Sequence, residues 1–304
     1  VLLVSIGASV VIPQKQEAEE KVLNVDHLHF SYQPGKAILS DISFDVKKGE
    51  MISIVGKNGA GKTTLSNLIC GFLEPSNGKI ELNGKDISPL SVKERGEHIG
   101  IVMQNPNQMI SKPMIYEEVA LGLTVRGVPE EEIRERVYET LKICGLYQFR
   151  NWPVSALSFG QKKRVTIASV LVQDPELIIL DEPTAGQDFH HYTEIMEFLR
   201  KLNEEGVTVV MITHDVEEAV LADQVILMGC PNGQKDPNTV LAQGSVREIL
   251  TDSRLLIQAG IVPPMAVRMY EDLKLAGIEL NRCPLTKEEL AERHELMLAL
   301  PTMA

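Results

Sequence analysis

The chain has 304 residues, of which 44% are hydrophobic and 24% are charged, an ordinary composition for one large globular domain or two unequal ones. Its net charge of −12 argues against a general nucleic-acid-binding protein, because phosphate backbones are held mainly by clustered lysines and arginines. The four cysteines are widely spaced and form no Cys-x-x-Cys pair, which argues against both a metal knuckle and a disulfide framework: Cys70, Cys144, Cys230 and Cys283.

The chain opens on twelve mostly apolar residues, from Val1 to Ile12, and turns polar over residues 13–21. This run is too short to span a bilayer, and no basic residues precede it as they would in a secretory signal. We therefore regard residues 1–21 as a separate N-terminal segment. Because the chain begins without Met, two interpretations carry equal weight: the segment is a remnant or linker of a longer polypeptide, or it is simply a strand or an arbitrary boundary.

Two strands are predicted next. Residues 22–30 alternate apolar and polar side chains, which is the period of a half-exposed strand, and a turn at residues 33–36 leads to a second strand over residues 38–46. A further turn leads into the apolar run Met51–Val55, which has the pattern of a buried strand. Two antiparallel strands are thus expected before a parallel core.

The stretch that follows, Gly56–Thr63, reads Gly-Lys-Asn-Gly-Ala-Gly-Lys-Thr and leads into a segment with helical spacing. A strand, a glycine-rich loop and a helix in this order are typical of a phosphate-binding loop, whose backbone N–H groups face phosphate oxygens at a helix N-terminus. Lys62 is expected to reach the outer phosphates and Thr63 to offer its hydroxyl to Mg²⁺. The alternative is a glycine-rich turn that binds nothing.

Further strands and helices alternate downstream and predict a parallel sheet with helices on both faces. A block of predicted helices interrupts this alternation at about residues 105–174, as an inserted helical subdomain would, after an exposed loop over residues 105–116. The expected strands cover residues 79–82, 99–103, 177–180 and 207–213. The expected helices cover residues 117–126, 129–144, 160–173 and the region around 192–202, with one helical turn at residues 91–94.

Two strand ends carry polar residues suited to phosphate chemistry. The apolar strand at residues 177–180 ends in Asp181 and Glu182; the first could hold Mg²⁺ and the second could polarise a water. The next strand ends in His214, on the same edge of a parallel sheet as the phosphate loop. Considered alone, the acidic pair fits a turn or cap equally well, and the histidine fits a strand terminus better.

A Leu-Ser-Phe-Gly-Gln stretch at residues 157–161 precedes Lys162, Lys163 and Arg164 at the start of a predicted helix. Cations at a helix N-terminus oppose the helix dipole by about 0.3–1 kcal/mol each, a penalty that a bound anion would reverse. Considered alone, this stretch indicates a Ser-capped helix with a solvated basic face.

The order of these motifs resembles that of the ATP-binding-cassette (ABC) ATPase family, over residues 22–254. The resemblance implies a P-loop nucleotide-binding domain of the α/β class, with an N-terminal antiparallel subdomain, and ATP and Mg²⁺ as its ligands. In it Tyr32 would stack on adenine, Gln104 would couple the metal site to a membrane partner, Glu182 would activate water and His214 would sense the γ-phosphate. The implied nucleotide contacts are Tyr32, Gly56, Asn58, Gly59, Ala60, Gly61, Lys62, Thr63, Thr64, Ser158, Gly160, Gln161 and Asp188; the implied metal contacts are Thr63, Gln104 and Asp181.

The same resemblance implies a second cassette domain, because Ser158, Gly160 and Gln161 would contact the ATP held by a partner. Asp188 would lie in the loop that crosses this interface. Two positions depart from the family pattern, since Phe159 replaces a usual Gly and Gln187 a usual apolar residue. Neither removes a group assigned to phosphate or magnesium, so we expect activity to survive. A homodimer, a heterodimer and a tandem chain stay open.

Residues 105–108 and 116–122, together with the tail at residues 255–304, resemble the energy-coupling-factor branch, whose ATPases power uptake of vitamins and transition-metal ions. We expect this tail to form a small helical extension that begins another capped helix at Thr286. The resemblance implies a peripheral place on the cytoplasmic face of the membrane, beside integral transporter subunits. The start without Met would also fit the second half of a tandem importer ATPase.

An alternative function is a soluble cassette ATPase that clamps ribosomes or nucleic acid without a membrane partner. The sequence between Gly56 and His214 shows no long heptad repeat and no large basic patch, which such proteins would favour. An unrelated phosphate-loop kinase or GTPase ranks last, because it does not account for Leu-Ser-x-Gly-Gln or for the strand-terminal histidine.

Overall fold

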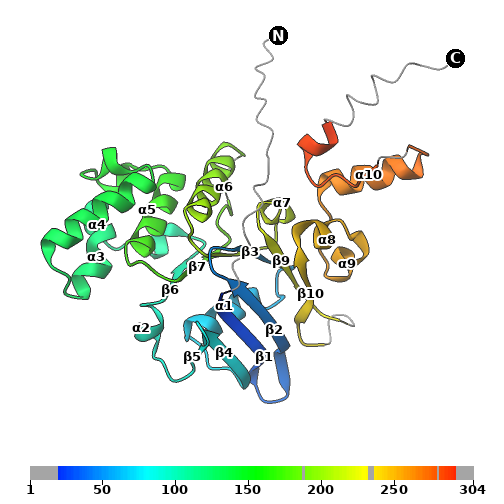
Figure 1. Ribbon diagram of the computed structural model, residues 1–304, viewed down its shortest axis with the longest axis horizontal. Coiled ribbons are helices and arrows are strands. Elements are labelled where there is room, and N and C mark those ends of the chain that lie inside the picture. The colour runs from blue at the N-terminus through cyan, green and yellow to red at the C-terminus, as the bar shows by residue number, and fades with distance from the viewer. Residues whose placement is uncertain (1–19, 187–188, 232–235, 279–280, 292–304) are drawn as a thin grey trace, which may run out of the picture.

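A computed structural model describes residues 20–186, 189–231, 236–278 and 281–291 of the chain. Two β-sheets enclose a central helix, a block of helices lies to one side, and the C-terminal helices lie on the other (Figure 1). The α/β class expected from the sequence is confirmed. The expectations for residues 1–19 and for Asp188 lie outside the described residues.

The first sheet is antiparallel and has the strand order β2-β1-β4-β5. Its strands are β1 (Lys21–Gln33), β2 (Lys36–Lys47), β4 (Asn77–Leu82) and β5 (Lys85–Asp86). Leu23 and Val25 point inside as the alternating pattern predicts, and a register irregularity after Val25, with His27 at a φ of 45°, brings Leu28 inside as well; each of the three leucine and valine residues is at most 1% exposed. Both predicted strands are confirmed, and each is longer than its alternating pattern because the strand continues into the turn.

The second sheet has the order β10-β9-β3-β8-β7-β6, and all neighbouring pairs are parallel except β9 with β10. Its strands are β3 (Met51–Val55), β6 (Ile99–Val102), β7 (Leu177–Asp181), β8 (Val209–Thr213), β9 (Gln224–Gly229) and β10 (Thr239–Ser245). Strand β3 is buried along its whole length, as the continuous apolar run predicts for a central parallel strand.

Helix α1 (Lys62–Cys70) lies between the two sheets. Its Leu65, Leu68 and Ile69 are at most 1% exposed and share one hydrophobic core with residues from both sheets. Each such side chain stabilises the fold by roughly 1.5–3 kcal/mol through burial of apolar surface. This packing fixes the helix that the glycine-rich loop opens.

The helical block contains α3 (Ile115–Val125), α4 (Glu130–Ile143) and α5 (Phe159–Leu171), with α6 (Phe189–Glu204) beside it (Figure 1). Short 3-10 turns lie at Pro106–Gln108, Tyr147–Phe149 and Val154–Ala156. Before the block, helix α2 (Val92–Arg95) begins with the predicted Ser91–Glu94 capping box. The predicted helices are confirmed with small shifts; α3 begins two residues earlier than expected.

The C-terminal region adds α7 (Val216–Ala219), α8 (Val246–Leu250), α9 (Ser253–Gln258) and α10 (Met265–Leu275). Ile261 and Leu285 pack into the same buried cluster as Val55 and Leu227 of the parallel sheet. Thr286 Oγ1 accepts the Glu289 N–H as predicted, but the Glu289 carboxylate accepts the N–H of Leu285 rather than that of Thr286. Among the described residues, the helices are too short or too polar to cross a membrane.

Candidate functional site

The register of the parallel sheet brings four strand ends to one edge. Val55 at the end of β3 pairs with Thr213 at the end of β8. Asp181, the last residue of β7, pairs with Ile212 of β8, and β6 ends next to β7 at Val102. The predicted residues that follow these strand ends therefore share this edge: Gly56, Gln104, Glu182 and His214.

The glycine-rich loop has the backbone that the sequence predicts. Gly59 and Gly61 have φ angles of 85° and 83°, in the left-handed region that favours glycine. Helix α1 begins without a side-chain cap and without an acidic residue in its first turn. The helix N-terminus therefore keeps unpaired N–H groups and the positive end of its dipole, as an anion site requires.

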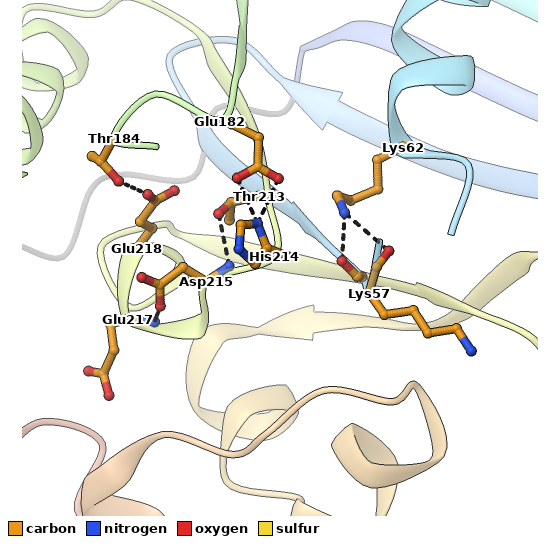
Figure 2. Close-up of polar contacts among 10 residues, drawn as sticks. Lys57, Lys62, Glu182, Thr184, Thr213, His214, Asp215, Glu217 and Glu218 are labelled. Carbon is orange, nitrogen blue, oxygen red and sulfur yellow. Dashed lines mark hydrogen bonds and ion pairs between the residues drawn. The ribbon is translucent and has the colours of Figure 1, made fainter. Parts of the chain in front are cut away.

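Lys62 bends back over this loop (Figure 2). Its Nζ donates to the carbonyl of Gly56 at 2.6 Å and to that of Lys57 at 3.3 Å. Burial lowers the pKa of Lys62, while Glu182 and Asp181 act in the opposite direction. The Lys62 ammonium therefore lies within electrostatic reach of Asp181 and Glu182, although the loop before Lys62 follows β3 and the acidic pair lies at the end of β7.

Two residues outside the loop, Leu39 and Asn238, pack against it or bind it, and the sequence patterns do not predict either contact. A Cβ at Gly61 would lie 2.5 Å from Leu39 Cδ2, so the loop packs directly on β2. Asn238 Nδ2 donates to the carbonyls of Gly59 at 3.2 Å and Ile38 at 3.3 Å. The sequence carries no signal for Asn238, which is 200 residues from Ile38 in the chain.

Tyr32 lies in β1 close to the start of α1. Its ring is 60% exposed and contacts Phe30 edge-to-face, with ring centroids 4.7 Å apart. Its hydroxyl lies 3.3 Å from Thr64 Oγ1, so the structure brings this sequence-predicted aromatic to the phosphate loop. An exposed, supported ring can stack on a planar base.

The acidic pair follows β7. Burial raises the pKa of Asp181, and the neighbouring Glu182 carboxylate raises it further, while Lys163 and Lys62 oppose the shift. Glu182 has a φ of 46°, an unusual value for a non-glycine residue and a mark of local strain. Its backbone is held by an N–H bond to the Ile212 carbonyl at 2.8 Å.

His214 faces Glu182 across the strand ends (Figure 2). Its Nδ1 lies 2.9 Å from Oε1 and 2.8 Å from Oε2 of the Glu182 carboxylate. Because a carboxylate only accepts hydrogen bonds, Nδ1 carries the hydrogen in this arrangement. The strand-terminal histidine is thus hydrogen-bonded to one carboxylate of the acidic pair, and its role as a γ-phosphate sensor stays a prediction.

A buried carboxyl lies behind these two residues. Glu218 of α7 is 2% exposed and accepts a hydrogen bond from Thr184, in the turn after Glu182 (Figure 2). Burial raises the pKa of Glu218 to about 8, although a hydrogen bond from Thr213 lowers it in part. Among the described residues its Oε2 has no hydrogen-bond partner. The sequence gives no sign of this role, because an acidic residue in a short helix is usually solvated.

Gln104 is exposed at the end of β6, as predicted. Its backbone carbonyl is held by Lys163 of α5, which corrects the expectation of a solvated basic face, because Lys163 is 0% exposed. The helix cap itself is confirmed: Ser158 and Gln161 form a capping box, and Gly160 is buried in the first turn. These three residues lie at the start of α5, in the helical block.

The fold and the loop geometry together are those of a phosphate-loop nucleotide-binding domain of the cassette type. A family model described as "ABC transporter" matches residues 39–185. The solved structure of cbiO1 from Clostridium perfringens is titled as part of the ABC transporter complex cbiONQ. It is 34% identical to this chain, with a TM-score of 0.71, and the match covers 86% of this chain and 100% of cbiO1. The chain therefore belongs to the ABC transporter family, as an ATP-binding domain.

Further relatives are similar over most of the chain. ABC transporter ATP-binding proteins of Clostridium perfringens and Enterococcus faecalis are each 56% identical, over 82% and 85% of this chain. The chain spans 43% and 44% of their lengths. A dimeric ATP-binding cassette solved in a post-hydrolysis state with ADP and phosphate is 31% identical, with a TM-score of 0.61, over 74% of this chain and 99% of its own.

Proposed function

We propose that this chain is the ATP-hydrolysing cassette of an energy-coupling-factor-type importer for a vitamin or a transition-metal ion. The observation that carries the proposal is the alignment of β3, β8, β7 and β6, which brings a phosphate loop, an acidic pair, a histidine and Gln104 to one edge. The likeness to cbiO1, titled as part of a transporter complex, supports the branch.

The phosphate loop would bind the triphosphate of ATP. The uncapped N-terminus of α1 offers backbone N–H groups, and Lys62 can exchange its two carbonyl partners for phosphate oxygens. The proposed nucleotide contacts on this side are Tyr32 and the loop residues Gly56, Asn58, Gly59, Ala60, Gly61, Lys62, Thr63 and Thr64. Tyr32 would stack on the adenine, since its exposed ring already stands beside Thr64.

The residues present also fit Mg²⁺. Thr63 is exposed at the first turn of α1, and Asp181 lies against Glu182, so a cation would offset two neighbouring negative charges. Thr63, Asp181 and Gln104 would hold the ion, all through oxygen atoms. When bound, Mg²⁺ neutralises charge that develops on the phosphate oxygens.

Glu182 would act as the general base that takes a proton from the attacking water. His214 Nδ1 contacts both carboxylate oxygens and would fix their orientation, so that the base points into the site rather than along its strand. Lys62 is buried, which lowers the pKa of its ammonium, and in this partly dehydrated place its charge would act strongly on a phosphate.

A second cassette domain would complete the site. Ser158, Gly160 and Gln161 lie at the start of α5 and would meet the ATP held by a partner, with Asp188 in the crossing loop. The dimeric form of a related solved cassette supports this arrangement. The complex would sit peripherally on the cytoplasmic face of the membrane, with integral subunits that receive the loop after Gln104.

Co-purification tests this function. The natural protein, tagged and extracted from membranes in detergent, should carry a second cassette domain and integral membrane proteins, and reconstituted vesicles should take up the retained vitamin or metal only with ATP. A Lys62→Ala preparation serves as the control that keeps the complex but loses uptake. Recovery of ribosomes or nucleic acid alone, with intact ATP binding, would favour the soluble clamp instead.

A further inference from the structure

Lys163 is a buried lysine in the helix that begins with Ser158. It is 0% exposed, and it heads the inward stripe of α5 that continues through Ile167 and Val170. Lysines are almost never fully buried without partners, because an ammonium loses its hydration there. A buried lysine in this stripe therefore needs a structural or functional reason.

Its partners lie at the end of β6. Nζ of Lys163 donates to the carbonyl of Met103 at 2.7 Å and to the carbonyl of Gln104 at 3.1 Å. An ammonium has three hydrogens and no acceptor, so two are used on consecutive carbonyls of one backbone segment. The lysine thus holds the two peptide groups that flank the α-carbon of Gln104.

Acidic groups of the strand-end site face the same lysine. Burial lowers the pKa of Lys163 to about 8, and Asp181 and Glu218 act against this shift. Two carboxyl groups from β7 and α7 thus lie within electrostatic reach of an ammonium supplied by α5. The lysine is not an isolated core residue, because three elements of the site converge on it.

Arg95 shows what a purely structural version of this contact looks like. It is 5% exposed, and its Nη1 donates to the carbonyls of Leu68 at 2.9 Å and Ile69 at 3.1 Å. These carbonyls close the C-terminal end of α1, at the opposite end from the phosphate loop. The two cations have matched chemistry, and only Lys163 holds a residue of the proposed site.

We propose that Lys163 is the positioning residue of Gln104, and that it joins the Gln104 segment to the helix that presents Ser158, Gly160 and Gln161. The inference rests on the proposed function, in which Gln104 belongs to the ATP and Mg²⁺ site of its own chain and the start of α5 contacts the ATP bound by the partner domain. Lys163 is then a direct mechanical link between two nucleotide sites, made by one side chain.

The test compares Lys163→Met with Arg95→Met and Gln104→Ala in the full chain. Lys163→Met should leave the affinity for a fluorescent ATP analogue within about threefold of wild type and lower kcat by about tenfold to a hundredfold, as a displaced catalytic group does. Gln104→Ala should give a similar loss. Lys163→Arg keeps charge and donors and should recover most of kcat.

Hydrogen exchange supplies a readout that does not depend on turnover. Amides of residues 103–112 should exchange faster in Lys163→Met than in Arg95→Met at matched global stability. Equal exchange of this segment in the two variants, or equal kcat per folded molecule, would overturn the positioning role. Absence of hydrolysis by the wild-type chain would contradict the proposed function, and the exchange comparison would then decide the inference by itself.

Discussion

Gly61 shows how one backbone position ties the nucleotide loop to the sheet below it. Its φ is 83°, and an added Cβ would lie 2.5 Å from Leu39 Cδ2, so alanine there meets both backbone strain and a clash. Gly59 has a similar φ of 85° but open space around its Cβ position.

These two glycines give a matched pair of variants. Gly59→Ala should lower the free energy of unfolding by about 1–2 kcal/mol, the cost of the left-handed conformation. Gly61→Ala should lower the free energy of unfolding by about 1–3 kcal/mol more than Gly59→Ala does, because the added methyl group overpacks against Leu39. Denaturant titration measures both, and equal losses in the two variants would contradict the close packing of the loop on β2.

Glu218 predicts a pH dependence of stability. Its folded pKa of about 8 lies above the ordinary value of 4.5, so the folded state binds more protons between these values. The contribution of this carboxyl is therefore fully present below about pH 4.5 and is lost as the pH rises toward 8. Glu218→Gln has no such titration.

The stability of wild type relative to Glu218→Gln should fall between pH 5 and pH 8, by on the order of 4 kcal/mol. Chemical denaturation of both proteins across this range measures it. Glu135→Gln, on the exposed side of α4, is the control and should follow wild type. A constant difference between wild type and Glu218→Gln would show that Glu218 titrates normally in the folded protein.

The sequence identifies site residues that belong to contiguous motifs. The phosphate loop, the acidic pair and the capping box at Ser158 are each readable within a few residues, because their chemistry depends on local spacing. Lys163, Glu218 and Asn238 cannot be identified in this way, because the partners Gln104, Thr184 and Ile38 lie 59, 34 and 200 residues away along the chain. Local patterns favour solvent for two of them, and the structure buries both.

Elements with a clear apolar period are predicted well, and those defined by their neighbours are not. Strand β3 and helix α4 follow from sequence patterns alone. The antiparallel pair β9 and β10 has no counterpart among the strands expected from the sequence, and the short helices α8 and α9 carry too few residues for a period to show. Tertiary contact, with Leu256 at 0% exposure, holds them in place.

The C-terminal extension, still a predicted domain, is attached through one arginine in particular. Arg247 of α8 donates to the carbonyl of Cys283 at 2.8 Å and pairs with Glu289 at 2.6 Å. Arg247→Ala should lower the free energy of local opening of residues 285–291 by about 1–3 kcal/mol, because both partners lose a charged donor. Hydrogen exchange measures it, with the exposed Arg254→Ala as control, and unchanged exchange in Arg247→Ala would exclude this attachment.

At the scale of the whole molecule, the site is a product of sheet register. Gly56, Gln104, Glu182 and His214 are spread over more than half of the chain, and the parallel pairing of β3, β8, β7 and β6 alone brings them to one edge. A one-residue slip of any of these strands would turn its side chains to the opposite face. The motif order in the sequence predicts this edge because parallel strands share a direction.

The most direct measurement of the central claim is ATP hydrolysis by Glu182→Gln beside ATP binding by the same protein. Glu182→Gln should lower kcat by roughly 10²–10⁴-fold, the contribution of a general base, with nucleotide affinity near that of wild type. Lys62→Ala should instead weaken binding itself, since it removes the charge that faces the phosphates. Undiminished hydrolysis by Glu182→Gln would contradict the assignment of the base and, with it, the chemistry proposed for this sheet edge.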